Sequence, residues 1–253
     1  MNKKSVKERV FLMSIYRFIQ IFGIYFRFSI YSFLRDIFLY IKDFFRYKNN
    51  NGNFSFGYLY PCLKDKTKNT PLEPVYFFQD TWAAKKIFEI KPKKHVDIGS
   101  NAKTVGIISQ FVPTTMVDIR PLPLKLQNLN FIKGSILKLP FEDDSIECIS
   151  SLCVIEHIGL GRYGDDIDSF GSEKSVGELK RVVKENGYIL FSVPVYKENK
   201  IFFNANRAFK RDYILKLFEG CELVEEKYIY GNTMHNEYRE ESGIGCFLFK
   251  KLN

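Results

Sequence analysis

The sequence is poor in the residues that most often bind zinc. It has three histidines and five cysteines, and no two cysteines form a Cys-x-x-Cys pair. Because the histidines show no ligand spacing with the cysteines, we expect no metal site. The cysteine number is odd, and most of the cysteines lie in apolar stretches. This usage predicts buried free thiols and a reducing, cytoplasmic location.

Long uncharged runs are also missing. Residues 10–47 are dense in Phe, Tyr, Ile and Leu, but the longest stretch without charge, Phe18–Phe26, has nine residues. A transmembrane helix needs ~20. The segment also lacks the clean apolar core and small-residue cleavage site of a signal peptide. We therefore expect residues 1–48 to lie on a surface rather than to cross a membrane.

Positive charge is concentrated in this same segment. Residues 1–48 contain ten Lys and Arg and three acidic residues, a net +7 of the total +9. A nucleic-acid enzyme would be expected to carry its basic excess on the folded domain, so we expect no nucleic-acid partner. On a helix, seven polar side chains fall within an arc of roughly 100°, namely Arg9, Arg17, Gln20, Arg27, Arg35, Lys42 and Arg46. The pattern predicts a basic, aromatic amphipathic helix that binds an anionic membrane surface; packing on protein is the alternative.

The rest of the chain alternates short β-branched runs with helical stretches. This alternation predicts an α/β fold with a mostly parallel sheet of about seven strands and crossover helices. Residues 49–90 are expected to form a linker and a lead-in helix, and residues 91–253 the α/β domain. We predict a helix over Ser175–Lys184, ended by a C-cap at Asn186-Gly187.

Candidate ligand-binding residues follow the predicted strands. Asp97, Gly99 and Asn101 lie at the end of the first strand, in His95-Val96-Asp97-Ile98-Gly99-Ser100-Asn101. Asp118 ends the second strand 19 residues after Gly99, close to the ~20 expected for a carboxylate that binds ribose hydroxyls. The Gly-x-Gly-x-x-Gly pattern of nicotinamide enzymes is absent. Ligands of open α/β sheets bind at these strand ends.

Two further segments carry candidate side chains. Ser135 and Ile136 follow the short third strand, before Leu139-Pro140-Phe141-Glu142-Asp143. After the fourth strand, His157 is the candidate general base because imidazole titrates near neutral pH, and Glu156 could orient it or shape the pocket. Candidate substrate ligands are Arg162, Tyr163, Asn204 and Arg207. For several of these, solvated loop residues are the plainer interpretation.

These segments together resemble the uncharacterised DUF268 family, which is similar to the class I, Rossmann-like methyltransferases that use S-adenosylmethionine (SAM). The resemblance covers roughly residues 58–230 and includes Pro61-Cys62-Leu63-Lys64-Asp65, Gln79-Asp80-Thr81-Trp82 and Phe203-Asn204-Ala205-Asn206-Arg207. It implies SAM as cofactor, bound through Asp97, Gly99, Asn101, Asp118, Ser135 and Ile136. Asn101 and Lys103 stand where glycines are usual, and Ser135 stands where an acid is usual.

The expected activity is O-methylation of a small-molecule, sugar or lipid-linked glycan acceptor by a peripheral enzyme at a membrane surface. A non-catalytic Rossmann-like binding module, favoured by Asn101, Lys103 and Ser135, is one alternative. A nucleotide-sugar enzyme with the same sheet is another.

Overall fold

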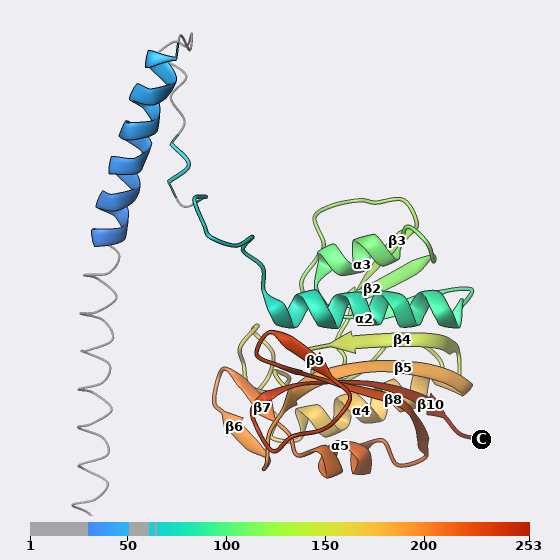
Figure 1. Ribbon diagram of the computed structural model, residues 1–253. Coiled ribbons are helices and arrows are strands. Elements are labelled where there is room, and N and C mark those ends of the chain that lie inside the picture. Colours follow the sequence, from blue (N-terminus) through green and yellow to red (C-terminus); the bar gives the residue numbers. More distant parts are fainter. Residues whose placement is uncertain (1–29, 51–60, 64) are drawn as a thin grey trace, which may run out of the picture. The chain divides into compact units, whose positions relative to one another are not determined.

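The computed structural model describes residues 30–50, 61–63 and 65–253. The chain forms two compact units, residues 1–71 and residues 72–253 (Figure 1). The first 29 residues of the predicted amphipathic segment lie outside the described residues. The predicted division at residues 48 and 90 stays a prediction.

In the first unit, residues 30–49 form a helix. Most of its large hydrophobic side chains are exposed, including Tyr31, Phe38 and Phe45. Asp36 is buried and accepts hydrogen bonds from the Arg35 guanidinium at 2.7 and 2.9 Å. Among the described residues, no helix has both the length and the apolar character needed to cross a bilayer. Binding of this segment to a membrane stays a prediction.

The second unit begins with the lead-in helix, α2 (Pro74–Ile90). The Glu73 carboxylate accepts from the Val75 N–H at its N-terminus, and Pro74 occupies the first turn, where a missing N–H costs nothing. The helix ends at Lys91, which adopts the left-handed conformation (φ 54°). Its buried positions, Gln79, Trp82, Ala83 and Ile87, recur at helical spacing, so one face of α2 packs inward.

A central sheet of eight strands has the order β3-β2-β1-β4-β5-β10-β8-β9, against the seven or so expected. Strands β1 to β5 are parallel, whereas β10 runs antiparallel to β5 and to β8. The short hairpin β6–β7 forms a separate two-stranded sheet. The bounds are β1 (His95–Ile98), β2 (Thr114–Asp118), β3 (Leu129–Lys133), β4 (Ile146–Leu152), β5 (Val183–Val195), β6 (Lys200–Phe202), β7 (Asn206–Ala208), β8 (Cys221–Tyr230), β9 (Thr233–His235) and β10 (Gly243–Lys251).

Helices cover both faces of this sheet (Figure 1). On one face, α2 and α3 (Ala102–Ile108) pack through Trp82, Ile87 and Ile108. On the other, α4 (Gly171–Val182) and α5 (Arg211–Leu217) pack through Leu179 and Ile214. All five side chains are at most 5% exposed, and burying each contributes about 1.5–3 kcal/mol to folding. The expected α/β fold with a mostly parallel sheet is confirmed.

The C-cap predicted at Asn186-Gly187 is wrong. Helix α4 ends at Val182, and Val183 is already extended at ψ 129°. Both valines are fully buried, so packing takes the chain directly from helix into strand β5. Asn186 does have a positive φ of 60°, but it lies where the pairing of β4 with β5 is irregular. The left-handed residue therefore accommodates a break in the strand, not a helix end.

Candidate functional site

The turn after β1 is shaped by a buried carboxylate. The Asp97 side chain accepts from the Ser100 N–H at 3.0 Å and from the Ser150 hydroxyl at 2.6 Å. Burial raises its pKa to about 6. Since Asp97 is 1% exposed, it stabilises the turn from below instead of facing a ligand. Gly99 itself has a φ of +68°, and an added Cβ would lie 3.1 Å from Val154 Cγ1, so the turn requires glycine.

Asn101 begins helix α3 as its N-cap, and its side chain accepts from the Lys103 N–H at 3.0 Å. The residue that replaces a family glycine therefore has a capping role. Asn101 is exposed and lines a hollow that also includes Gly99, Asp118 and Tyr76. The turn thus keeps its shape without a glycine at this position.

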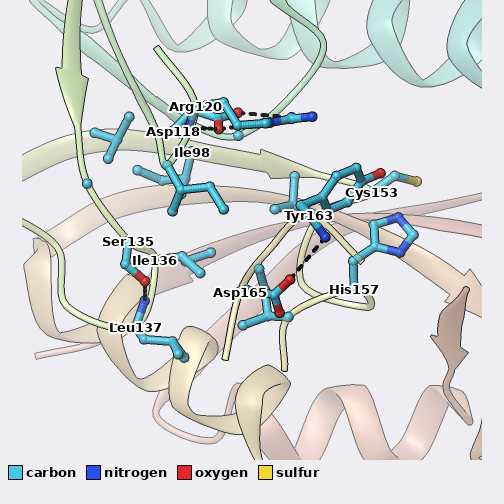
Figure 2. A pocket seen from close by; sticks show the side chains of 16 residues that line it. Ile98, Asp118, Arg120, Ser135, Ile136, Leu137, Cys153, His157, Tyr163 and Asp165 are labelled. Carbon is cyan, nitrogen blue, oxygen red and sulfur yellow. Dashed lines mark hydrogen bonds and ion pairs between the residues drawn. The ribbon is translucent and has the colours of Figure 1, made fainter. Parts of the chain in front are cut away.

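Asp118 lies at the end of β2 and faces the neighbouring pocket (Figure 2). Its carboxylate accepts from the Arg120 N–H at 2.8 Å and from the Arg120 guanidinium at 3.3 Å. The same guanidinium lies 4.6 Å from the centre of the Tyr163 ring. This cation–π contact joins the end of β2 to the loop between β4 and α4. Arg120 was not among the candidates from the sequence, although its place two residues after Asp118 was visible there.

Ser135 and Ile136 line the opposite side of this pocket, as Figure 2 shows. The Ser135 hydroxyl accepts from the Leu137 N–H at 3.2 Å and retains its own proton for a ligand. Apolar side chains also line the pocket, among them Ile119, Ile136, Leu137 and Ile158. The pocket therefore combines the carboxylates of Asp118 and Asp165, the hydroxyl groups of Ser135 and Tyr163, an open glycine turn and an apolar wall.

A buried polar cluster lies at the end of β4. Cys153 has a φ of +52°, and its thiol donates to the Gln79 side-chain oxygen at 2.9 Å. The Ser192 hydroxyl donates to the same oxygen at 2.7 Å. Glu156 lies beside this cluster, 2% exposed, and its Oε2 has no hydrogen-bond partner among the described residues. Burial raises the pKa of Glu156 to about 8, so its carboxyl group is mostly protonated at neutral pH.

His157 lines the pocket, and its ring is held by the main chain. Nδ1 lies 2.6 Å from the Ala205 carbonyl oxygen, which can only accept, so Nδ1 carries a proton. Nε2 then presents a lone pair. Glu156 Oε1 lies 3.7 Å from Nε2, beyond hydrogen-bond distance. Burial lowers the pKa of His157 and favours the neutral ring. The Ala205 carbonyl therefore holds the ring by a hydrogen bond, and an orienting role for Glu156 stays a prediction.

The predicted substrate ligands divide into two groups. Tyr163 lines the pocket, and Arg162 is exposed nearby, where it donates to the Ala205 carbonyl at 2.9 Å. Arg207 is 5% exposed, and its guanidinium donates to the carbonyls of Ile158 at 2.5 Å and Asp168 at 3.0 Å. The Arg207 guanidinium therefore holds the β4–α4 loop in place. This use argues against a role in acceptor binding. Asn204 occupies the hairpin turn with a φ of 60° and lines none of the described hollows.

Asp165 is a pocket residue that was not among the candidates from the sequence. Its carboxylate accepts from the N–H groups of Gly159 at 2.6 Å and Tyr163 at 3.2 Å. Gly159 allows this folded loop because an added Cβ would lie 2.1 Å from the Asp168 carbonyl oxygen. Among the described residues, no group of three or more Asp, Glu, His or Cys side chains is arranged to hold a metal ion.

Comparison with known proteins supports the resemblance. Residues 138–241 match the family model DUF268, described as a Caenorhabditis protein of unknown function. Within this range the resemblance to DUF268 is confirmed. No curated protein matches the chain.

Solved structures share the fold at low identity. A putative sarcosine dimethylglycine methyltransferase from Galdieria sulphuraria is 15% identical, with a TM-score of 0.53 over 70% of this chain and 85% of that one. A 1,6-didemethyltoxoflavin N1-methyltransferase from Burkholderia thailandensis, solved with S-adenosylhomocysteine (SAH), is 11% identical, with a TM-score of 0.50 over 73% and 93%. The [4+2]-cyclase SpnF is 10% identical, with a TM-score of 0.50 over 67% and 81%. The fold is therefore Rossmann-like and methyltransferase-like, while its chemistry has to be argued from the site.

The residues at the pocket fit SAM in chemical type. The Asp118 carboxylate suits the two ribose hydroxyls, and the Ser135 hydroxyl can bond a polar edge of adenine. The apolar wall suits the faces of the purine ring, and the Gly99 turn leaves backbone open to the amino-acid moiety. Of the six predicted cofactor residues, Asp97 is the one that is buried and does not line either hollow.

Proposed function

We propose that the chain is a SAM-dependent methyltransferase that methylates an oxygen of a sugar or of a lipid-linked glycan at a membrane surface. The observation that carries the proposal is the pairing of the Gly99 turn with the Asp118 carboxylate at adjacent strand ends. Both line two neighbouring hollows, one of which His157 also lines. Strand ends on either side of a switch in strand order are where open α/β sheets bind ligands, and β1 and β4 flank such a switch here.

When bound, SAM would supply an electrophilic methyl group on a positively charged sulfur. That methyl group would pass to the acceptor oxygen, with SAH as the product. The hydroxyl proton moves to His157 Nε2, the ring nitrogen with a free lone pair. The Ala205 carbonyl keeps the ring in this tautomer, and burial keeps it neutral and ready to accept.

The acceptor class is supported by two weaker features. Tyr163 and Arg162 are exposed at the mouth of the pocket, where they could bond hydroxyl or phosphate groups. The basic residues 1–48 could hold the protein at an anionic membrane. A peripheral location is part of the proposal, as is a cytoplasmic one, which rests on the five free cysteines.

A non-catalytic binding module is the second candidate, because Ser135 supplies a weaker hydrogen bond than the acid usual at this position. Calorimetric titration of the full chain with SAH tests whether the cofactor site that an enzyme needs is functional. We expect micromolar binding, weakened by roughly 1.5–3 kcal/mol in Asp118→Ala, the cost of losing hydrogen bonds to a charged group. The matched control is Asp166→Ala, an exposed carboxylate on the same loop as Tyr163. Absence of heat with the wild-type chain would contradict the methyltransferase proposal.

A further inference from the structure

Five large hydrophobic side chains gather on two segments beside the site. Ile167 and Phe170 lie on the loop before α4 and are 68% and 65% exposed. Ile201, Phe202 and Phe203 lie at the tip of the β6–β7 hairpin and are 62%, 52% and 75% exposed. We call these five residues the apolar rim. Leaving this much apolar surface in water is unfavourable, and patches of this kind mark binding surfaces.

The two segments are joined by specific hydrogen bonds. Buried Arg207, at the base of the hairpin, donates to the Asp168 carbonyl at 3.0 Å, within the loop that carries Ile167 and Phe170. Its own N–H donates to the Glu156 carbonyl at 2.9 Å. The Ala205 carbonyl, in the hairpin turn, holds the His157 ring. The apolar rim is therefore built onto the same framework that positions the candidate base.

The tip of the hairpin carries no negative charge. Residues 199–209 contain no acidic side chain, and Lys197, Lys200 and Lys210 flank the tip in sequence. At the base of the hairpin, Lys200 pairs with Glu198 at 2.9 Å and Lys210 with Asp212 at 3.2 Å. Lys200 lies 4.6 Å from the centre of the Tyr196 ring, so cation and aromatic ring occupy the base of the hairpin. Aromatic and aliphatic tips above lysines are the composition of segments that insert into the bilayer interface. The exposed face of the 30–49 helix has the same chemistry, with Phe38 and Phe45 beside Lys42 and Arg46.

We propose that the apolar rim inserts into the surface of a phospholipid bilayer, so that the neighbouring pocket receives the polar part of a membrane-held acceptor. The acceptor statement rests on the proposed function, whereas the membrane contact does not. The rim differs from residues 1–48 in how it would bind. Its contribution comes from apolar burial and survives high salt, while attraction through a basic segment is screened.

The test is partition of the full chain into vesicles of phosphatidylcholine with one third phosphatidylserine, at low and at high salt. The variant Ile201→Ser/Phe202→Ser/Phe203→Ser should partition about ten-fold more weakly, and this ratio should persist at high salt. The matched control, Phe88→Ser/Val224→Ser/Leu252→Ser, removes three exposed hydrophobic residues outside the rim and should partition like the wild type. Equal partition of the rim variant and the wild type in both salts would overturn the proposal.

A second measurement does not depend on the stability of the triple variant. Phe203→Trp places an indole at the most exposed rim position, while the native Trp82 is 5% exposed. Its emission should shift to the blue on vesicles and be quenched by lipids brominated in the acyl chains. If the chain sediments with vesicles but the indole shows neither change, another surface binds the lipid, and insertion of the rim is refuted. Loss of SAH binding in the calorimetric test would refute the methyltransferase while leaving this result intact.

Discussion

The two halves of the candidate site differ in how their side chains are used. In the cofactor half, Gly99, Asp118 and Ser135 follow three neighbouring strands and line hollows at the sheet edge. In the other half, which would bind the acceptor, Arg207 and Asn204 were expected to face a substrate. Arg207 instead donates hydrogen bonds to loop carbonyls, and Asn204 occupies a turn. Residues at strand ends are thus placed by the sheet, while residues in long loops are placed by contacts that the loop makes with itself.

The same contrast explains why Glu156 and His157 are not hydrogen-bonded to each other. Adjacent residues Glu156 and His157 invite a direct interaction, yet the ring bonds the Ala205 carbonyl, 48 residues away. Glu156 instead turns into the protein, where burial keeps it mostly protonated at neutral pH. Three substitutions test the two halves against each other.

The largest effect is expected in the acceptor half. His157→Ala should lower kcat by roughly 10²–10⁴-fold, the range for a lost general base, and leave SAH affinity nearly unchanged. Glu156→Gln should lower kcat less, because the Ala205 carbonyl and not Glu156 holds the ring. Steady-state kinetics with an acceptor found by screening for SAH release would measure both, with His235→Ala as the control histidine. A near-normal kcat in His157→Ala would remove the base from the mechanism.

Burial of Glu156 predicts a pH-dependent stability. Its folded pKa of about 8 lies above the ordinary 4.5, so the folded state binds the extra proton between these values. The free energy of unfolding of the wild type should therefore fall as pH rises through this window, by on the order of 3 kcal/mol from this group. Glu156→Gln should lose less stability between pH 5 and pH 8.5 in urea denaturation, whereas exposed Glu185→Gln should behave like the wild type. Parallel pH profiles for all three chains would contradict the buried, protonated carboxyl.

The smallest effect is expected in the cofactor half. Ser135→Asp should tighten SAH binding by up to about ten-fold, because a charged acceptor bonds an amino group more strongly than a hydroxyl does. The new carboxylate can keep the bond to the Leu137 N–H with one oxygen and offer the other to the ligand. Calorimetry measures the change, and Ser135→Ala should bind more weakly than the wild type. If Asp and Ala have the same effect, position 135 does not contact the ligand.

Much of the fold could be predicted from local pattern. Short β-branched runs alternate with helical stretches, and burial of both sheet faces makes that alternation visible as apolar strands such as Ile146–Leu152. The short strands β6, β7 and β9 were not predicted, because three residues carry too little periodicity. The helix end at Val182 was missed for a related reason. Packing of Val182 and Val183 ends the helix, whereas the sequence near Asn186-Gly187 has the local pattern of a helix C-cap.

The sequence by itself determined the doubly covered α/β sheet and the positions of Gly99 and Asp118, because a residue that follows a parallel strand is carried to the ligand-binding edge by the backbone alone. Only the tertiary structure decided which loop side chains reach the pocket. The Arg120–Tyr163 contact, the Ala205 carbonyl on His157 and the Arg207 bonds to the β4–α4 loop join segments 43 to 49 residues apart or in different loops. Such pairings depend on how loops fold against each other, and no short-range periodicity encodes them.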